Sequence, residues 1–260
     1  MGRRPPECRR RRSFAWPYVA LFCAALTPEP APAQGGPPLL TDDPFTPGPG
    51  RWEINVALTA ELRPAERGYE SPLLDLNYGL GERIQLKYEL PWVVLDEHGD
   101  TRSGLGNSNV GVKWRFYEDA HRGLAVSVYP QLEFNNPTDS ADRGLVDRGT
   151  ALLLPVELSL RLGPVDINPE LGYAIREKDA DELVYGLALS YAPGEALEWL
   201  GELHGTTALG PDETDLVADV GLRWAFGSRF SLLAAAGTGL IGPGEGPIDF
   251  LGYLGLQLRL

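Results

Sequence analysis

Charged side chains recur at alternate positions through most of this 260-residue chain, and they offer its most distinctive chemistry. Bases cluster in two neighbouring segments, and acids lie on several others. Opposite charges on facing walls of a pore set up an electric field that orients dipolar solutes and filters ions. The residues predicted to line such a channel are Glu53, Glu61, Arg83, Lys87, Glu89, Lys113, Arg115, Glu133, Glu157, Glu202, Asp219 and Arg223.

Catalytic and metal-binding patterns are weak by comparison. His204 lies beside Glu202 in the polar register, but no motif marks a serine as its nucleophilic partner, so a phospholipase site is not predicted. Neither Asp42-Asp43 nor the acidic loop 177–182 has the spacing of a Ca²⁺ loop. The glycine strings GLGNSNVG and GTGLIGPGEG open no helix, so they form no phosphate cradle. We therefore expect no enzyme activity, no metal and no cofactor.

The segments that carry these charges alternate in polarity with a period of two, which is typical of strands with two different faces. The pattern predicts twelve strands, most of them ten to fourteen residues long. A tilted strand of about 9 to 11 residues spans a bilayer. The predicted strands lie near 52–62, 71–80, 82–95, 107–118, 123–135, 150–162, 164–176, 182–192, 196–209, 214–226, 229–241 and 248–260.

Loop lengths and aromatic residues indicate which end of each strand lies at the periplasmic side of the membrane. Connections after even-numbered strands are short, and those after odd-numbered strands are mostly longer, including 96–106 and 136–149. Bacterial outer-membrane barrels alternate short periplasmic turns with longer external loops, and carry aromatic girdles at both membrane interfaces. The predicted interface aromatics are Trp52, Tyr78, Trp92, Trp114, Phe116, Phe134, Tyr191, Trp199, Trp224, Phe226 and Phe230.

Residues 1–33 differ in kind from the rest and have the features of a secretory signal. Arginines precede the apolar stretch 13–27, and an A-x-A motif predicts cleavage between Ala33 and Gln34. Cleavage removes both cysteines, so the mature chain lacks disulfides and thiolate chemistry. It also removes six arginines and two acids from totals of 23 and 36, which changes the formal charge from −13 to −17. This acidic balance argues against a nucleic-acid partner.

Alternation alone does not fix which face of a barrel is apolar. A soluble β-sandwich or a lipocalin-like barrel also alternates, with its apolar face turned inward. Strand length, the even strand number, the loop asymmetry, the aromatic bands and the export signal together favour the membrane form. The predicted fold class is therefore all-β, a twelve-stranded antiparallel transmembrane β-barrel of outer-membrane type that follows a cleaved signal peptide.

The interior of this barrel has two possible states. Twelve strands enclose less space than the roughly 16 to 18 strands of an open porin. In one state, the charged side chains face an open pore and set up an electric field across it. In the other, they form ion pairs with one another and fill the lumen. Residues 34–50 are rich in proline and glycine and form no regular element. They are predicted to be a periplasmic tether or a plug that enters the barrel 51–260 from below, and the sequence leaves both open.

Four stretches carry a family resemblance: TDDPFTPGPGRWEIN (41–55), PLLDLNYGLGERIQLKYELPW (72–92), GLGNSNVGVKWRF (104–116) and YPQLEFNNPT (129–138). They resemble the outer-membrane family named for the MetA pathway of phenol degradation, over nearly the whole mature chain. The resemblance implies a channel for aromatic or other apolar small molecules. One departure is the end of the chain, where Leu260 stands in place of the usual terminal aromatic.

These features together predict a monomeric channel in the outer membrane of a Gram-negative bacterium, for passive passage of small, hydrophobic or aromatic molecules. The alternative is an envelope barrel with a structural or ligand-binding role and no transport. The expected partners are outer-membrane lipid and lipopolysaccharide, a small-molecule solute and the outer-membrane assembly machinery.

Overall fold

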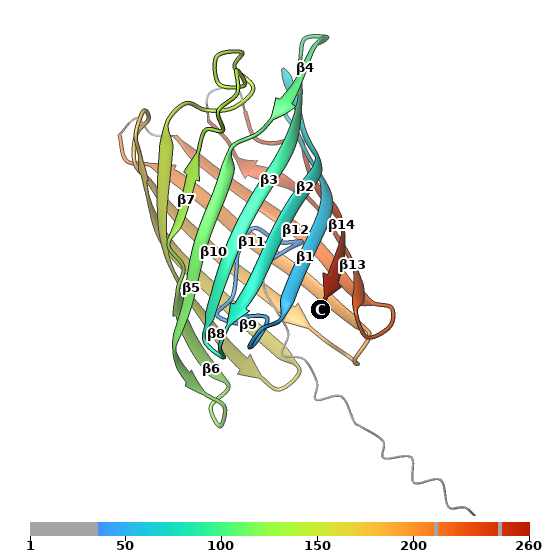
Figure 1. Ribbon diagram of the computed structural model, residues 1–260. Helices are drawn as coiled ribbons and strands as arrows, with labels where there is room; N and C mark the ends of the chain where they lie inside the picture. The colour runs from blue at the N-terminus through green and yellow to red at the C-terminus, as the bar shows by residue number, and fades with distance from the viewer. Residues whose placement is uncertain (1–35, 211–212, 244–245) are drawn as a thin grey trace, which may run out of the picture. The chain divides into compact units, whose positions relative to one another are not determined.

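A computed structural model describes residues 36–210, 213–243 and 246–260 (Figure 1). The predicted signal and its cleavage position at Ala33 and Gln34 lie outside these residues. No helix in the described part of the chain is long and apolar enough to cross a membrane. The strands are β1 (Trp52–Leu62), β2 (Glu66–Leu80), β3 (Ile84–Glu97), β4 (Asp100–Leu105), β5 (Ser108–Asp119), β6 (Leu124–Val128), β7 (Gln131–Phe134), β8 (Thr150–Leu162), β9 (Val165–Arg176), β10 (Glu182–Tyr191), β11 (Leu197–Ala208), β12 (Thr214–Ala225), β13 (Phe230–Ile241) and β14 (Phe250–Arg259).

These strands form one antiparallel sheet that closes on itself, because β1 pairs with β14 and β3 pairs with β5. The fourteen strands occupy twelve positions in the barrel. β6 and β7 share one position, since both pair with β5 and with β8 and only Tyr129 and Pro130 separate them. Pro130 has no N–H to continue the ladder. β3 continues past the region in which it pairs with β5, and its last part forms a hairpin with β4. The predicted twelve-stranded antiparallel barrel is confirmed.

The second strand begins earlier than its pattern indicates. β2 starts at Glu66 rather than near residue 71, so only residues 63–65 connect it to β1. The pairing with β3 shifts between Glu70 and Leu73, at the position of Pro72. A proline without an N–H and a bulge together interrupt the alternation, which hides the continuation of the strand from the sequence.

Side-chain burial gives the two faces of the sheet opposite characters. Apolar residues in mid-strand point outward, and Val220 in β12 is 70% exposed. Polar residues of the other register are buried inside, including Asn55, Lys113 and Glu157. A soluble barrel has the reverse distribution, with its apolar face inside. The apolar residues that the sequence pattern assigns to the lipid-facing side of the barrel are therefore the exposed ones.

Most of the predicted interface aromatics lie on this outer face. Nine are among the exposed large side chains, and Tyr78 and Phe134 are partly covered. Several pack against one another, as in the pair Trp52–Tyr78, whose ring centroids are 4.8 Å apart. Rings with an apolar body and a polar edge suit the boundary between lipid and water. The nine exposed residues are Trp52, Trp92, Trp114, Phe116, Tyr191, Trp199, Trp224, Phe226 and Phe230.

Antiparallel order gives the barrel two different ends. We call the end with turns 81–83, 120–123 and 163–164 the short-loop end, and the end with 135–149 and 177–181 the long-loop end. The chain enters β1 and leaves β14 at the short-loop end, where Trp52 and Leu260 exchange backbone hydrogen bonds.

Candidate functional site

Residues 36–50, which we call the N-terminal segment, run through the inside of the barrel (Figure 1). Glu202 of β11 accepts hydrogen bonds from the backbone N–H groups of Leu40 at 2.6 Å and Thr41 at 2.8 Å. Glu170 of β9 accepts one from the N–H of Asp42 at 3.0 Å. Bonds to ionised acceptors are stronger than neutral ones. Two carboxylates of the barrel wall therefore hold three successive backbone groups of the segment.

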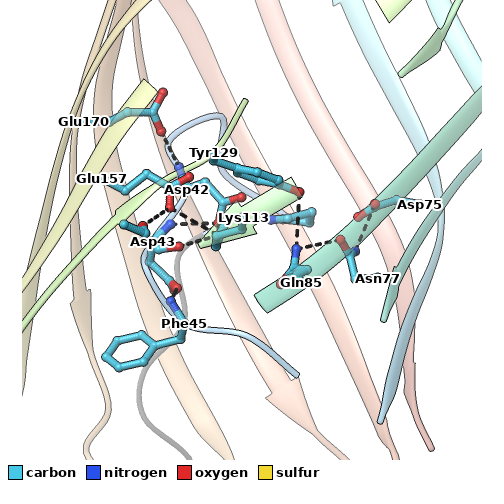
Figure 2. Close-up of polar contacts among 12 residues, drawn as sticks. Asp42, Asp43, Phe45, Asp75, Asn77, Gln85, Lys113, Tyr129, Glu157 and Glu170 are labelled. Carbon is cyan, nitrogen blue, oxygen red and sulfur yellow. Dashed lines mark hydrogen bonds and ion pairs between the residues drawn. The ribbon is translucent and has the colours of Figure 1, made fainter. Parts of the chain in front are cut away.

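Lys113 of β5 holds the segment from another wall (Figure 2). Its Nζ lies 2.9 Å from Asp42 Oδ1 and 3.4 Å from Glu157 Oε2, and it also donates to the carbonyl oxygen of Asp43. Lys113 is only 1% exposed, so its charge is balanced inside the protein rather than by water. Burial raises the pKa of the Asp43 carboxyl to about 7, although the positive charge of Lys113 lowers it.

Three further contacts fit the segment to the wall. Arg223 of β12 donates to the carbonyl oxygen of Pro37 at 3.0 Å. Leu39 forms a buried apolar cluster with Ala188 and Leu200. Gly186 of β10 leaves space for the segment, because a Cβ there would lie 2.2 Å from Thr41 Oγ1. While position 41 is threonine, a larger residue than glycine at position 186 displaces the segment.

A polar network fills the remaining space at the level of Lys113 (Figure 2). Gln85 donates to Tyr129 Oη at 3.2 Å and to Asn77 Oδ1 at 2.7 Å. Asp75 accepts from Asn77 at 3.0 Å and from Asn55 at 2.9 Å. All five side chains are buried. The N-terminal segment and this network together fill the lumen over the half nearer the short-loop end.

The other half of the lumen contains a cavity of about 900 Å³. Leu39, Leu40 and Asp42 of the segment line it, as do Leu145, Val146 and Asp147 from the long loop 135–149. Its walls combine carboxylates with apolar side chains. The lumen is thus filled in the half nearer the short-loop end and contains a cavity in the other half. The structure therefore combines the filled and the open interior, the two alternatives that follow from the sequence. Within the described residues, no group of three His, Cys, Asp or Glu side chains is arranged to hold a metal.

The predicted channel-lining residues fall into three groups. Glu61, Lys87, Glu89, Glu133 and Asp219 line the cavity. Lys113, Arg115, Glu157, Glu202 and Arg223 are buried in the filled part. Two lie outside both: Glu53 pairs with Arg259 at 3.2 Å, and Arg83 is exposed in the turn before β3. Alternation assigns a side chain to a face only within a strand, and Arg83 precedes its strand.

The sequence did not single out Glu170 or Glu70, which also line the cavity. Glu170 continues the inward register of Asp166 and Asn168 in β9, so alternation could have found it. Glu70 lies before the predicted start of its strand, where Pro72 interrupts the pattern.

No family model and no curated protein matches the chain. Solved structures with the same fold include an outer membrane channel from Pseudomonas putida F1, which is 17% identical, with a TM-score of 0.63 over 87% of this chain and 100% of that one. The NanC porin is 8% identical, with a TM-score of 0.60 over 80% of this chain and 100% of the porin. The KdgM porin is also 8% identical, with a TM-score of 0.54 over 79% of this chain and 98% of the porin.

Proposed function

We propose that this chain is an outer-membrane channel for the passive passage of small molecules, and that the N-terminal segment is its gate. The observation that carries this proposal is an apolar outer surface around a polar interior with a cavity of about 900 Å³. A solute enters the cavity from the long-loop end and crosses when the segment leaves the filled half. Residues 1–33 act as the export signal, and 51–260 form the barrel.

The apolar outer face supports insertion into lipid, and a substitution at its centre tests this. Val220→Arg in mid-β12 is expected to lower the free energy of unfolding by about 2–4 kcal/mol, because it buries a charge at the bilayer midplane. Leu209→Arg, just past the end of β11, is the control and is expected to cost about 0–1 kcal/mol. Urea unfolding in lipid vesicles measures both. Equal costs for the two variants would argue against a lipid-facing wall.

The solute that we propose is a small molecule with an apolar or aromatic part, as the resemblance to the MetA-named family implies. Leu73, Leu153 and Val184 provide apolar surface on the cavity wall. The cavity volume also lies within the range of about 300–1,000 Å³ that is usual for small-molecule sites. We assign no enzymatic role to the barrel.

The partners follow from the outer surface and the closed sheet. Lipid and lipopolysaccharide cover the exposed apolar belt, and the outer-membrane assembly machinery inserts the barrel. Because β1 pairs with β14 and β3 pairs with β5, the barrel wall is closed and its strands do not pair with those of another copy, which supports a monomer.

A structural or ligand-binding barrel without transport is the alternative function. Liposome swelling separates the two. Liposomes that contain the mature chain are expected to take up small uncharged sugars faster than protein-free liposomes, with a rate that falls as the sugar becomes larger. Swelling at the protein-free rate for every sugar would favour the alternative.

A further inference from the structure

We propose that the cavity selects organic cations: it binds an ammonium group among its carboxylates, and the apolar body of the same molecule contacts its apolar wall. This inference rests on the proposed channel function and names the charge class of its solute. It requires three features of the cavity: an excess of negative charge, a hydrogen-bond acceptor without an internal partner, and a surface that suits the apolar part of an organic cation.

The cavity has a large excess of acids. Ten carboxylate side chains line it, against Lys87, Arg176 and one histidine, within the described residues. Five of the ten form no ion pair in the described part of the chain: Glu66, Glu70, Glu133, Glu170 and Asp219. Like charges in a cavity surrounded by lipid repel one another, because low-dielectric walls focus the field. An entering cation relieves this repulsion, whereas an anion increases it.

Oδ1 of Asp219 is the acceptor atom without an internal hydrogen-bond partner. Asp219 is 6% exposed, it lines the cavity, and its Oδ1 atom has no hydrogen-bond partner in the described structure. Its cross-strand neighbour in β11 is Glu202, a second carboxylate. A buried acceptor without a partner carries a free-energy cost that a bound donor removes. An ammonium group supplies both the missing donor and the opposite charge.

Aromatic and aliphatic side chains favour an organic cation over an inorganic one. Tyr69 and Tyr253 line the cavity, and Tyr253 Oη has no hydrogen-bond partner in the described structure. Ring faces attract alkylammonium groups through cation–π interactions, most strongly in desolvated sites. Leu73, Leu153 and Val184 then contact the apolar body.

Two probes with the same ring and opposite charge test the proposal. Isothermal titration of the full mature chain is expected to show saturable binding of benzylammonium and at least tenfold weaker binding of benzenesulfonate. In planar bilayers under a KCl gradient, the reversal potential is expected to show preference for K⁺ over Cl⁻.

A charge-removing variant and a matched control locate the effect. Glu70→Gln/Glu133→Gln removes two cavity charges and is expected to weaken benzylammonium binding several-fold and to reduce the preference for K⁺. Asp139→Asn/Glu213→Gln removes two exposed carboxylates near the same end of the barrel and is expected to leave both unchanged.

The outcomes separate this inference from the channel proposal. Conductance with equal or greater permeability to Cl⁻, or equal binding of the two probes, overturns the cation proposal and leaves the channel in place. Binding of the cation alone without any conductance supports the cation site and contradicts the channel. An equal effect of both double variants also overturns the assignment to this cavity.

Discussion

Deletion of residues 36–46 is expected to raise the single-channel conductance several-fold and to lengthen the openings. The segment occupies the half of the lumen where Glu202, Glu170 and Lys113 hold its backbone. Its removal replaces chain with water and leaves those side chains solvated. Gly50 and Arg51 are kept in the variant, because their backbone hydrogen bonds with Gly79 anchor the start of β1. Recordings in planar bilayers at fixed voltage measure the change.

A second variant controls for the length of chain in the lumen. Replacement of residues 36–46 by a glycine–serine linker of the same length keeps the chain but removes its specific contacts. This variant is expected to flicker between closed and open levels rather than remain open. If both variants conducted like the unaltered chain, the N-terminal segment would not be the gate.

The second large effect is expected from Lys113→Met, a change of nearly equal size that removes the buried charge. Glu157 is fully buried, and Lys113 is its ion-pair partner. Breaking a buried pair by removing one partner costs about 3–5 kcal/mol, because the other charge stays uncompensated. Urea unfolding in vesicles measures the loss. Limited proteolysis of the N-terminal segment is expected to become faster in the same variant, because its contacts to Asp42 and Asp43 are lost.

Arg122→Met is the control for this effect. Its side chain is 77% exposed and pairs with Asp119 at the surface, so its loss is expected to cost less than about 1 kcal/mol. Glu157→Gln added to Lys113→Met is expected to recover part of the stability, because it removes one charge that Lys113 had balanced. An unfolding free energy for Lys113→Met equal to that of Arg122→Met would contradict this role of the buried pair.

The sequence was informative where a strand keeps two uniform faces. Residues 150–162 were predicted as a strand and form β8 with the same bounds. The sequence was less informative where a proline interrupts the ladder. Pro72 concealed the first part of β2, and Pro130 divides one barrel position into β6 and β7. The hairpin strand β4 was predicted as loop, since it contains only six residues and is largely polar.

The candidate site shows a different limit of sequence reasoning. The alternation of polar and apolar residues places Glu202 and Lys113 inside the barrel. It gives no information about their depth in the lumen or about the groups that they contact there. Glu202 binds backbone N–H groups of residues 40 and 41, and every residue other than proline carries such a group. No side-chain pattern therefore marks this contact. The position of the segment inside the barrel depends on the packing of Thr41 against Gly186, and these residues are 145 positions apart in the chain.

One disulfide tests most directly whether the N-terminal segment gates the lumen. In Thr41→Cys/Gly186→Cys, the two Cβ positions lie 3.1 Å apart, a few tenths of an ångström closer than the roughly 3.5–4.5 Å of a disulfide, and the expected mature chain has no other cysteine. We expect this bond to form on oxidation, to hold the conductance at its closed level, and to release brief openings on reduction. Thr41→Cys/Gly194→Cys, whose second site lies in an exposed turn, is expected to form no bond. Free thiols in the first variant after oxidation, or full conductance with the bond formed, would contradict the account.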